Sequence, residues 1–463
     1  KNNIFTFPKH YKMDLQFKLT KDFIEEIQEL IASDNREAVV NSLNKLHEAD
    51  IAEILDVVSM EEAKYIFRLL EDERASDVLV ELEEDIRLKF LKALSAKEIA
   101  EQMDNMDSDD AADIMAEMPE EKQEAVIQQI EDPQQAIDIA SLMQYEENTA
   151  GAIMGTELIC VNENWTTDQC IEEMRIQAED VQYIYTVYVV DNDKRLTGML
   201  SLKSLLFAKR GTLVKDIYIE NVRSVNSDES TEEVASMMQK YDFVALPVLN
   251  PDRILIGRIT IDDVVDIIQE EAEKDYQMAS GISENVESSD SVFALTRARL
   301  PWLIVGLVGG VLGAKVIGLF EVQLGQFPEM ALFIPLIAAM AGNVGVQSSA
   351  IVVQGIASNN IDLSGIVGKL FKEFRVALLN GIVCAILIFL FIFLVDSDLK
   401  LGLTVGLSLL AVIIFAGIFG TLVPLLLHKR NIDPALATGP FITTSNDVIG
   451  LFLYLYIGYL FYF

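Results

Sequence analysis

Five long apolar stretches in the second half constrain this chain more than any other feature. Each reaches the roughly 20 residues that an α-helix needs to cross the hydrocarbon of a bilayer. Within lipid such a stretch has to be a helix, because each backbone N–H and C=O must find a partner inside the segment. The sequence therefore predicts a five-helix, all-α transmembrane domain over residues 291–463, with spans at about 300–320, 331–355, 374–395, 401–427 and 435–463.

Charge separates this half of the chain from the rest. From Ser291 onward there are eight Asp/Glu and nine Lys/Arg, whereas residues 1–290 carry 64 Asp/Glu and 27 Lys/Arg, a net charge of −37. Such an acidic excess disfavours nucleic acid and anionic lipid headgroups as partners. It suits cations, and it is also typical of a solvated, solubilising helical surface. We expect no nucleic-acid partner.

The first 133 residues predict an acidic helical domain. The segments "ADIAEILDVVSMEEAKYIFRLL", "ASDVLVELEEDIRLKFLKAL" and "KEIAEQMDNMDSDDAADIMAEMPEEKQEAVI" share one pattern. Each has apolar residues at helical spacing, then an acidic turn, then a second helix. Stacked helical hairpins of this kind form a superhelical domain.

After Pro133 the residue pattern changes from amphipathic helices to a duplicated α/β pattern. "YTVYVVDNDKRLTGMLSLKSLL" and "FVALPVLNPDRILIGRITIDDVVDII" each hold two β-rich runs around a turn, followed by a helix, with Gly198 and Gly257 in matching places. The duplication resembles a tandem pair of CBS domains over 150–210 and 211–270. Pairs of this family often bind adenine nucleotides or metal ions, so the resemblance makes ATP a candidate ligand.

Residues 262–290 read as a connecting helix that passes into a polar linker. Under alternating topology, one side of the membrane collects Arg297, Arg299, Lys369, Lys372, Arg375, Lys429 and Arg430. The other side collects Glu321, Glu329, Asp396 and Asp398. The positive-inside rule then predicts a cytoplasmic soluble part and an external C-terminus. The opening residues show no signal-peptide pattern, in keeping with this orientation.

Enzymatic chemistry has little support in the sequence. The chain has three histidines, and its three cysteines show no metal-ligand or disulfide spacing. "GLVGGVLG" lies in an apolar span with no strand before it, so it indicates close helix packing and not a phosphate loop. We expect no enzyme activity.

The last span carries a carboxylate, Asp447, in its middle. An acid at mid-membrane costs about 2.5–3.5 kcal/mol even on the lenient insertion scale, and no Lys or Arg in this span can pair with it. We expect the helix to start at Asp433, as N-cap, and Pro434. On such a helix Asp433, Thr443 and Asp447 share one face, and Pro440 frees a carbonyl oxygen. Carboxylate, hydroxyl and carbonyl oxygens are ligands of hard cations, which predicts an ion site.

The second span contains "GNVGVQ". Asn343 and Gln347 are four residues apart and share a helix face, while Gly342 and Gly345 allow another backbone to approach. Two interpretations stay open. The amides form hydrogen bonds between helices, or they orient the water of a hydrated ion.

The domain order, with "GNVGVQ" in the second span and "DPALATGPFITTSND" in the fifth, resembles the MgtE family of magnesium channels over almost the whole chain. The resemblance implies a homodimer with a pore between its membrane halves. It places the pore ion site at Asp447, within a wall formed by the second and fifth spans. It also implies that the cytoplasmic domains sense Mg²⁺.

The same resemblance implies regulatory metal ligands in the soluble part. Along the acidic run into the connecting ("plug") helix they are Asp263, Asp266, Glu271 and Asp275. Lys274 stands where the family often has another acid, which implies one ligand fewer or one ion fewer. On the N-domain they are Asp109, Asp110 and Asp113. The alternative is that these acids only solvate their helices.

The function predicted from these features is Mg²⁺ uptake across a bacterial inner membrane, closed by cytoplasmic Mg²⁺. Alternatives are a CBS-regulated transporter of another divalent cation (Mn²⁺, Co²⁺ or Ca²⁺) and a membrane sensor that transports nothing. A CBS-bearing anion channel predicts basic or hydroxyl-lined spans, which these acid-bearing spans do not match.

Overall fold

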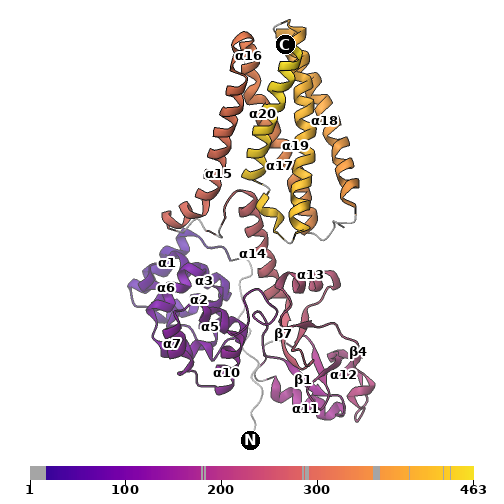
Figure 1. The fold of residues 1–463 in the computed structure, drawn as a ribbon. Helices are drawn as coiled ribbons and strands as arrows, with labels where there is room; N and C mark the ends of the chain where they lie inside the picture. Colours follow the sequence, from indigo (N-terminus) through magenta and orange to yellow (C-terminus); the bar gives the residue numbers. More distant parts are fainter. Residues whose placement is uncertain are drawn as a thin grey trace. The chain divides into compact units, whose positions relative to one another are not determined.

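The computed structural model describes residues 17–178, 181, 184–283, 286, 291–357, 365–395, 397–430, 432–437 and 439–462. They divide into two compact units, Lys1–Ile268 and Gln269–Phe463. The boundary falls inside one helix, α14 (Ile261–Ala279). Figure 1 shows the elements of both units.

Ten short helices open the first unit, as the repeated pattern predicts. They are α1 (Lys21–Ala32), α2 (Arg36–Leu43), α3 (Glu48–Val57), α4 (Met60–Phe67), α5 (Asp72–Glu81), α6 (Glu84–Ala93), α7 (Ala96–Met103), α8 (Ser108–Ala116), α9 (Glu120–Ile127) and α10 (Pro133–Leu142). The repeat extends to the helix starts, because Ser59 with Glu62 and Ser95 with Glu98 form equivalent capping boxes.

The helical array continues beyond residue 133, where the sequence predicts its end. Pro133 is the first residue of α10, with Asp132 as its cap. This helix packs against α8 and buries Ile139 and Leu142 in the core shared with the other helices. Proline suits the first turn of a helix as well as a boundary, so this residue alone does not distinguish the two.

The α/β part consists of two small sheets. The first has the strand order β1 (Ile159–Asn162), β2 (Val187–Val190), β3 (Leu196–Leu200), β4 (Ile219–Glu220), and the second the order β5 (Val225–Asn226), β6 (Ala245–Leu249), β7 (Leu255–Thr260). Their helices are α11 (Thr167–Gln177), α12 (Leu202–Phe207) and α13 (Thr231–Tyr241). Gly198 pairs with Val189 and Gly257 with Val248, each beside a register shift. The two halves of the duplicated sequence therefore form strand pairs with the same register.

Five helices in the described part of the second unit are long and apolar enough to cross a membrane, which confirms the predicted fold class. They are α15 (Val292–Leu319), α17 (Ile334–Ala357) with the 3₁₀ helix η2 (Pro328–Phe333) before it, α18 (Ile366–Val395), α19 (Leu399–His428) and α20 (Pro440–Tyr462); α16 (Glu321–Gln326) follows α15. The central helix is α19, which packs on α17, α18 and α20, whereas α15 packs on α20 (Figure 1).

The start of the last span differs from the prediction. Pro434–Ala437 form a separate 3₁₀ turn, η4, and α20 begins at Pro440. Asp433 caps that turn by accepting a 2.8 Å hydrogen bond from the Ala435 N–H. Asp433 and Asp447 therefore do not lie on one continuous helix. Pro440 is the first residue of α20, so it interrupts no hydrogen bond within that helix.

Glycines allow three membrane helices to approach one another closely. A Cβ built on Gly345 of α17 would overlap the Asn446 side-chain amide of α20 and lie 2.8 Å from Cγ2 of Ile442. A Cβ on Gly420 of α19 would overlap the Gly345 carbonyl oxygen. The small residues in "GNVGVQ" thus serve the close approach that their spacing predicts.

We predict that Gly345→Ala destabilises the bundle by about 1–3 kcal/mol, because the added methyl group forces these backbones apart. The check is thermal unfolding of the purified protein in detergent. Gly310→Ala on α15 is the matched control, since a Cβ there has no neighbour within 4 Å. Equal melting temperatures for the two variants would contradict the described packing.

Candidate ion sites

A cavity of about 430 Å³ lies between α17 and α20. It is lined by Ala338, Ala339, Gly342, Asn343, Val346, Gln347, Thr443 and Asp447. Four of the five residues predicted for the pore are therefore brought together, namely the two amides, the threonine and Asp447. Their role as ion ligands stays a prediction.

Helical periodicity explains this convergence. Asn343 and Gln347 are one turn apart on α17, and Thr443 and Asp447 are one turn apart on α20. Gly342 lets the two faces meet, since a Cβ there would lie 3.1 Å from Cγ2 of Thr443 and 3.4 Å from an Asp447 carboxylate oxygen. The Thr443 hydroxyl donates a 3.2 Å hydrogen bond to the Gly439 carbonyl.

The donor set of the cavity suits a hydrated hard cation. It combines one carboxylate, one hydroxyl and two amide groups, which accept hydrogen bonds from ion-bound water or coordinate directly. One water takes about 30 Å³ of liquid volume, so the cavity holds an ion together with an octahedral water shell. Asp433, the fifth predicted pore residue, is exposed and does not line the cavity.

A second group of carboxylates lies in the first unit. One carboxylate oxygen from each of Asp107, Asp109 and Glu157 lies within 4.8 Å of the other two. Glu157 is held in place by hydrogen bonds from the Ser108 N–H, at 3.0 Å, and the Ser108 hydroxyl, at 3.2 Å. Gly155 leaves room, since a Cβ there would lie 3.0 Å from Asp109 and 3.1 Å from Glu157. We name Asp107, Asp109 and Glu157 the acidic cluster.

Burial raises the pKa values of the acids in and around this cluster. The pKa of Asp107 rises to about 6 and that of Asp110 to about 7. Asp109 has a pKa well above its usual range, because it is buried and the carboxylates of Asp263 and Asp110 add repulsion. Burial also raises the pKa of Asp263, although Thr260 opposes the shift by donating two hydrogen bonds to its carboxylate.

One cation lies beside this negative charge. The Arg258 guanidinium is 3.7 Å from Asp107 and its side chain is almost fully buried. A single positive charge cannot balance three clustered carboxylates. The arrangement is therefore suited to a bound divalent cation, which carboxylate oxygens favour.

The other predicted regulatory acids are dispersed. Asp113 and Asp266 are exposed on α8 and α14, although burial and nearby Asp262 raise the pKa of Asp266. Glu271 and Asp275 are half-buried on the part of α14 that belongs to the second unit. The structure adds Asp107 and Glu157, which the sequence analysis missed. Asp107 is two residues before the predicted Asp109, so its sequence position could have suggested it. No sequence signal links Glu157 to these two acids.

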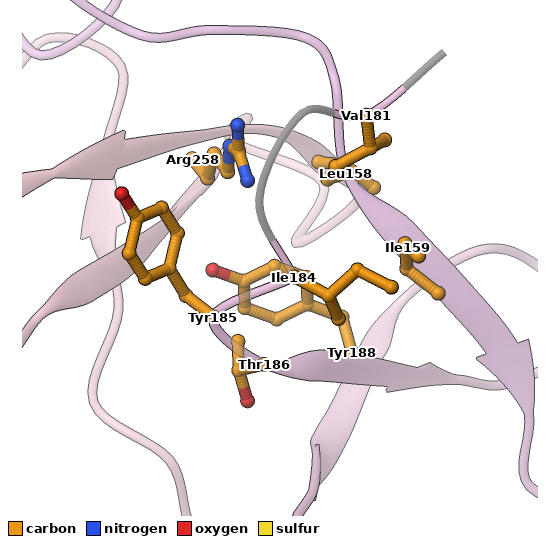
Figure 2. A pocket seen from close by; sticks show the side chains of 8 residues that line it. All are labelled: Leu158, Ile159, Val181, Ile184, Tyr185, Thr186, Tyr188 and Arg258. Atoms are coloured by element: carbon orange, nitrogen blue, oxygen red, sulfur yellow. The ribbon is translucent and has the colours of Figure 1, made fainter. Parts of the chain in front are cut away.

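A small pocket lies between the two CBS sheets. Figure 2 shows its lining, which is Leu158, Ile159, Val181, Ile184, Tyr185, Thr186, Tyr188 and Arg258. The Arg258 guanidinium is 5.7 Å from the centre of the Tyr185 ring. The pocket has no room even for a water molecule, whereas typical ligand sites enclose roughly 300–1,000 Å³. Arg258 thus contacts both this pocket and the acidic cluster.

The end of α14 touches the beginning of α20. A Cβ on Gly439 would lie 2.5 Å from the Ala279 carbonyl oxygen, and one on Gly281 would lie 2.6 Å from Cγ of Pro440. Gly281 has φ +81°, a conformation that favours glycine. The connecting helix and the helix that carries Asp447 therefore meet at two glycines, one against a backbone carbonyl and the other against the ring of Pro440.

These features define a multi-pass membrane protein in which a CBS-containing soluble unit is joined to a bundle with an acid-lined cavity. Residues 334–457 match the family model of MgtE, described as a divalent cation transporter. Residues 46–148 match the MgtE intracellular N domain, and 150–211 and 214–270 match CBS domains. The chain belongs to the MgtE family.

Curated relatives agree with this assignment. A magnesium transporter MgtE of Thermus thermophilus is 31% identical over 93% of this chain and 96% of its own length. One of Enterococcus faecalis is 36% identical over 71% of this chain and 72% of its own length. Among solved structures, the soluble part of a magnesium transporter has a TM-score of 0.50 and 28% identity, covering 54% of this chain and 98% of that one. The cytosolic domain of the Mg²⁺ channel MgtE in complex with ATP has a TM-score of 0.50 and 31% identity, covering 53% and 99%.

We predict that Asp109→Asn stabilises the soluble unit when divalent cations are absent. Because these pKa values are raised in the folded state, the folded soluble unit is stabilised when the acids are protonated. This stabilisation is present at low pH and is lost as the pH rises through about 6–7. In EDTA the parent should therefore melt at a lower temperature at pH 8 than at pH 5.5. The Asp109→Asn variant should show a weaker dependence.

Added Mg²⁺ should raise the melting temperature of the parent at pH 8 more than that of Asp109→Asn, because the variant loses one ligand. Glu120→Gln is the control, since Glu120 is exposed on α9, away from the cluster. Identical pH profiles for the parent and Asp109→Asn would show that the cluster carries no excess charge.

Proposed function

We propose that this protein transports Mg²⁺ into the cell and closes when cytoplasmic Mg²⁺ binds its soluble unit. The observation that carries the proposal is the cavity between α17 and α20, where Asp447 meets Thr443, Asn343 and Gln347. Its donors and volume suit a hydrated divalent cation. The relatives named above as magnesium transporters support Mg²⁺ as the ion.

The Asp447 carboxylate attracts the cation at mid-membrane, and the amides and hydroxyl orient its water. Mg²⁺ gives up its waters reluctantly, so contact through water favours it over ions that dehydrate easily. In the proposed homodimer two copies of Asp447 face one pathway. An inside-negative potential then drives entry, contributing about 4.6 kcal/mol for two charges across 100 mV.

Closure follows from the charge of the first unit. Asp107, Asp109 and Glu157 present a set of carboxylate oxygens that fits Mg²⁺, with Asp263 at the start of α14 adding to the same negative field. A bound cation cancels the repulsion among them and holds α14 in place. Because α14 meets α20 at Gly439 and Pro440, its position bears on the helix that carries Asp447. Mg²⁺ thereby favours the closed state by differential binding.

The pocket between the CBS sheets is the proposed site for an adenine nucleotide. The related cytosolic domain solved with ATP supports this ligand. The exposed ring of Tyr185 offers a stacking surface, and Arg258 offers a cation for phosphate. Because the pocket has no room even for a water molecule, these side chains have to move when the nucleotide enters.

The proposed location is a bacterial inner membrane. The first turns of α15 contain Arg297 and Arg299, and those of α18 contain Lys369 and Lys372. We place these helix ends in the cytoplasm by the positive-inside rule. The soluble unit then lies in the cytoplasm and the end of α20 outside.

We predict that Asp447→Asn lowers Mg²⁺ flux into liposomes about tenfold or more, and that Asp447→Ala is equally impaired, because the charge attracts the ion in a low-dielectric cavity. Asp433→Asn should have a smaller effect, since Asp433 is exposed and outside the cavity. Competition by Ca²⁺, Mn²⁺ and Co²⁺ in the same assay establishes selectivity. Normal flux through a folded Asp447→Ala protein would falsify the pore assignment.

We also predict that Arg258→Gln has two opposite effects. It should weaken ATP binding about tenfold or more, because a charged hydrogen-bond donor is lost. It should lower the Mg²⁺ concentration that protects α14 from protease, because the cluster loses its neighbouring positive charge. Arg210→Gln, at an exposed residue after α12, is the control. A rise in the Mg²⁺ requirement would contradict the second effect.

A further inference from the structure

Glu373 is an acid inside a membrane-spanning helix that the proposed pore does not use. It lies on α18 and is half-buried. Its carboxylate accepts a 2.6 Å hydrogen bond from the Ser348 hydroxyl of α17. This distance is at the short end of the usual range for a hydrogen bond between two oxygens.

Gly417 of α19 makes room for this pair. A Cβ built there would lie 3.1 Å from the Glu373 carboxylate and 3.6 Å from the Ser348 hydroxyl oxygen. The hydrogen bond therefore lies where α17, α18 and α19 meet. Ser349, the next residue, is fully buried, and its hydroxyl has no hydrogen-bond partner within the described residues.

Ser348 and the ion cavity lie on different faces of the same helix. Gln347 lines the cavity, and successive residues of an α-helix are about 100° apart, so the side chain of Ser348 leaves the helix in another direction. One helix therefore carries water-orienting amides on one face and an anchored hydroxyl on another. Any rotation or slide of α17 that moves Asn343 and Gln347 also disturbs the bond from Ser348 to Glu373.

We propose that Glu373 is a positioning residue for the ion cavity. By accepting the hydrogen bond from Ser348 it fixes the rotation of α17, and so fixes Asn343 and Gln347 opposite Asp447. The inference rests on the proposed function, since it concerns how that cavity recognises a hydrated ion. The effect requires an acceptor at position 373 and not a charge.

The test is Mg²⁺ flux into liposomes by the full chain, with Ca²⁺ as competitor. In Ser348→Ala and Glu373→Ala, the half-saturating Mg²⁺ concentration should rise about 3- to 10-fold, the range expected for one interhelical hydrogen bond, and discrimination against Ca²⁺ should fall. The maximal rate should change less. Glu373→Gln keeps an acceptor and should remain near the parent. Ser408→Ala is the control, since it removes a buried α19 hydroxyl that has no partner in the described residues.

The double variant Ser348→Ala/Glu373→Ala should be no worse than either single variant, because both remove the same bond. Melting temperatures in detergent show that each variant is folded. Unchanged half-saturation and Ca²⁺ competition in folded Ser348→Ala would overturn the inference alone. Impairment of Glu373→Gln equal to that of Glu373→Ala would also overturn it, by showing that charge at 373 matters. Absence of Mg²⁺ flux in the parent would overturn the proposed function itself.

Discussion

Taking carboxylates out of water costs free energy unless enough positive charge lies beside them, and each unit of this chain contains carboxylates with too little. In the membrane bundle Asp447 faces a cavity lined by neutral groups. In the soluble unit the acidic cluster has Arg258 as its neighbouring cation, at 3.7 Å from Asp107. In the proposed function the same partner, a divalent cation, removes the imbalance in each place. Transport and regulation would then depend on one kind of interaction, used at two sites.

Close packing of the membrane helices sets the positions of the side chains that line the cavity. The glycines at 342 and 345 bring α17 and α20 near enough for a carboxylate on one helix to face amides on the other. Gly417 and Gly420 bring α19 against α17 from a different direction. A helix held on several faces has little freedom to rotate, which suits the proposed site, where selectivity would depend on the orientation of ion-bound water.

Helical periodicity was enough to predict most of the cavity. The four-residue spacing of Asn343 with Gln347, and of Thr443 with Asp447, places each pair on one helix face. The acid in the middle of the last span then indicates which face of that helix lines the cavity. The predicted start of the last helix was wrong. Both Asp433-Pro434 and Gly439-Pro440 are favourable helix starts, and local sequence preferences do not decide between them. Glu157 could not be found, because its approach to Asp107 depends on how the helical array docks on the CBS pair. Glu373 was missed for the same reason, since its hydrogen bond to Ser348 joins two helices.

The contact between α14 and α20 has a consequence for how movement is transmitted. Gly439 faces a backbone carbonyl and Gly281 faces the rigid ring of Pro440, so no flexible side chain lies between the two segments at these contacts. Such a contact transmits a displacement directly, in contrast to an interface made by flexible side chains. A side chain at either glycine would overlap its neighbour and tilt the first turn of α20, whether or not a cation is bound. The entry angle of the helix that carries Asp447 is thus set by two residues that have no chemistry of their own.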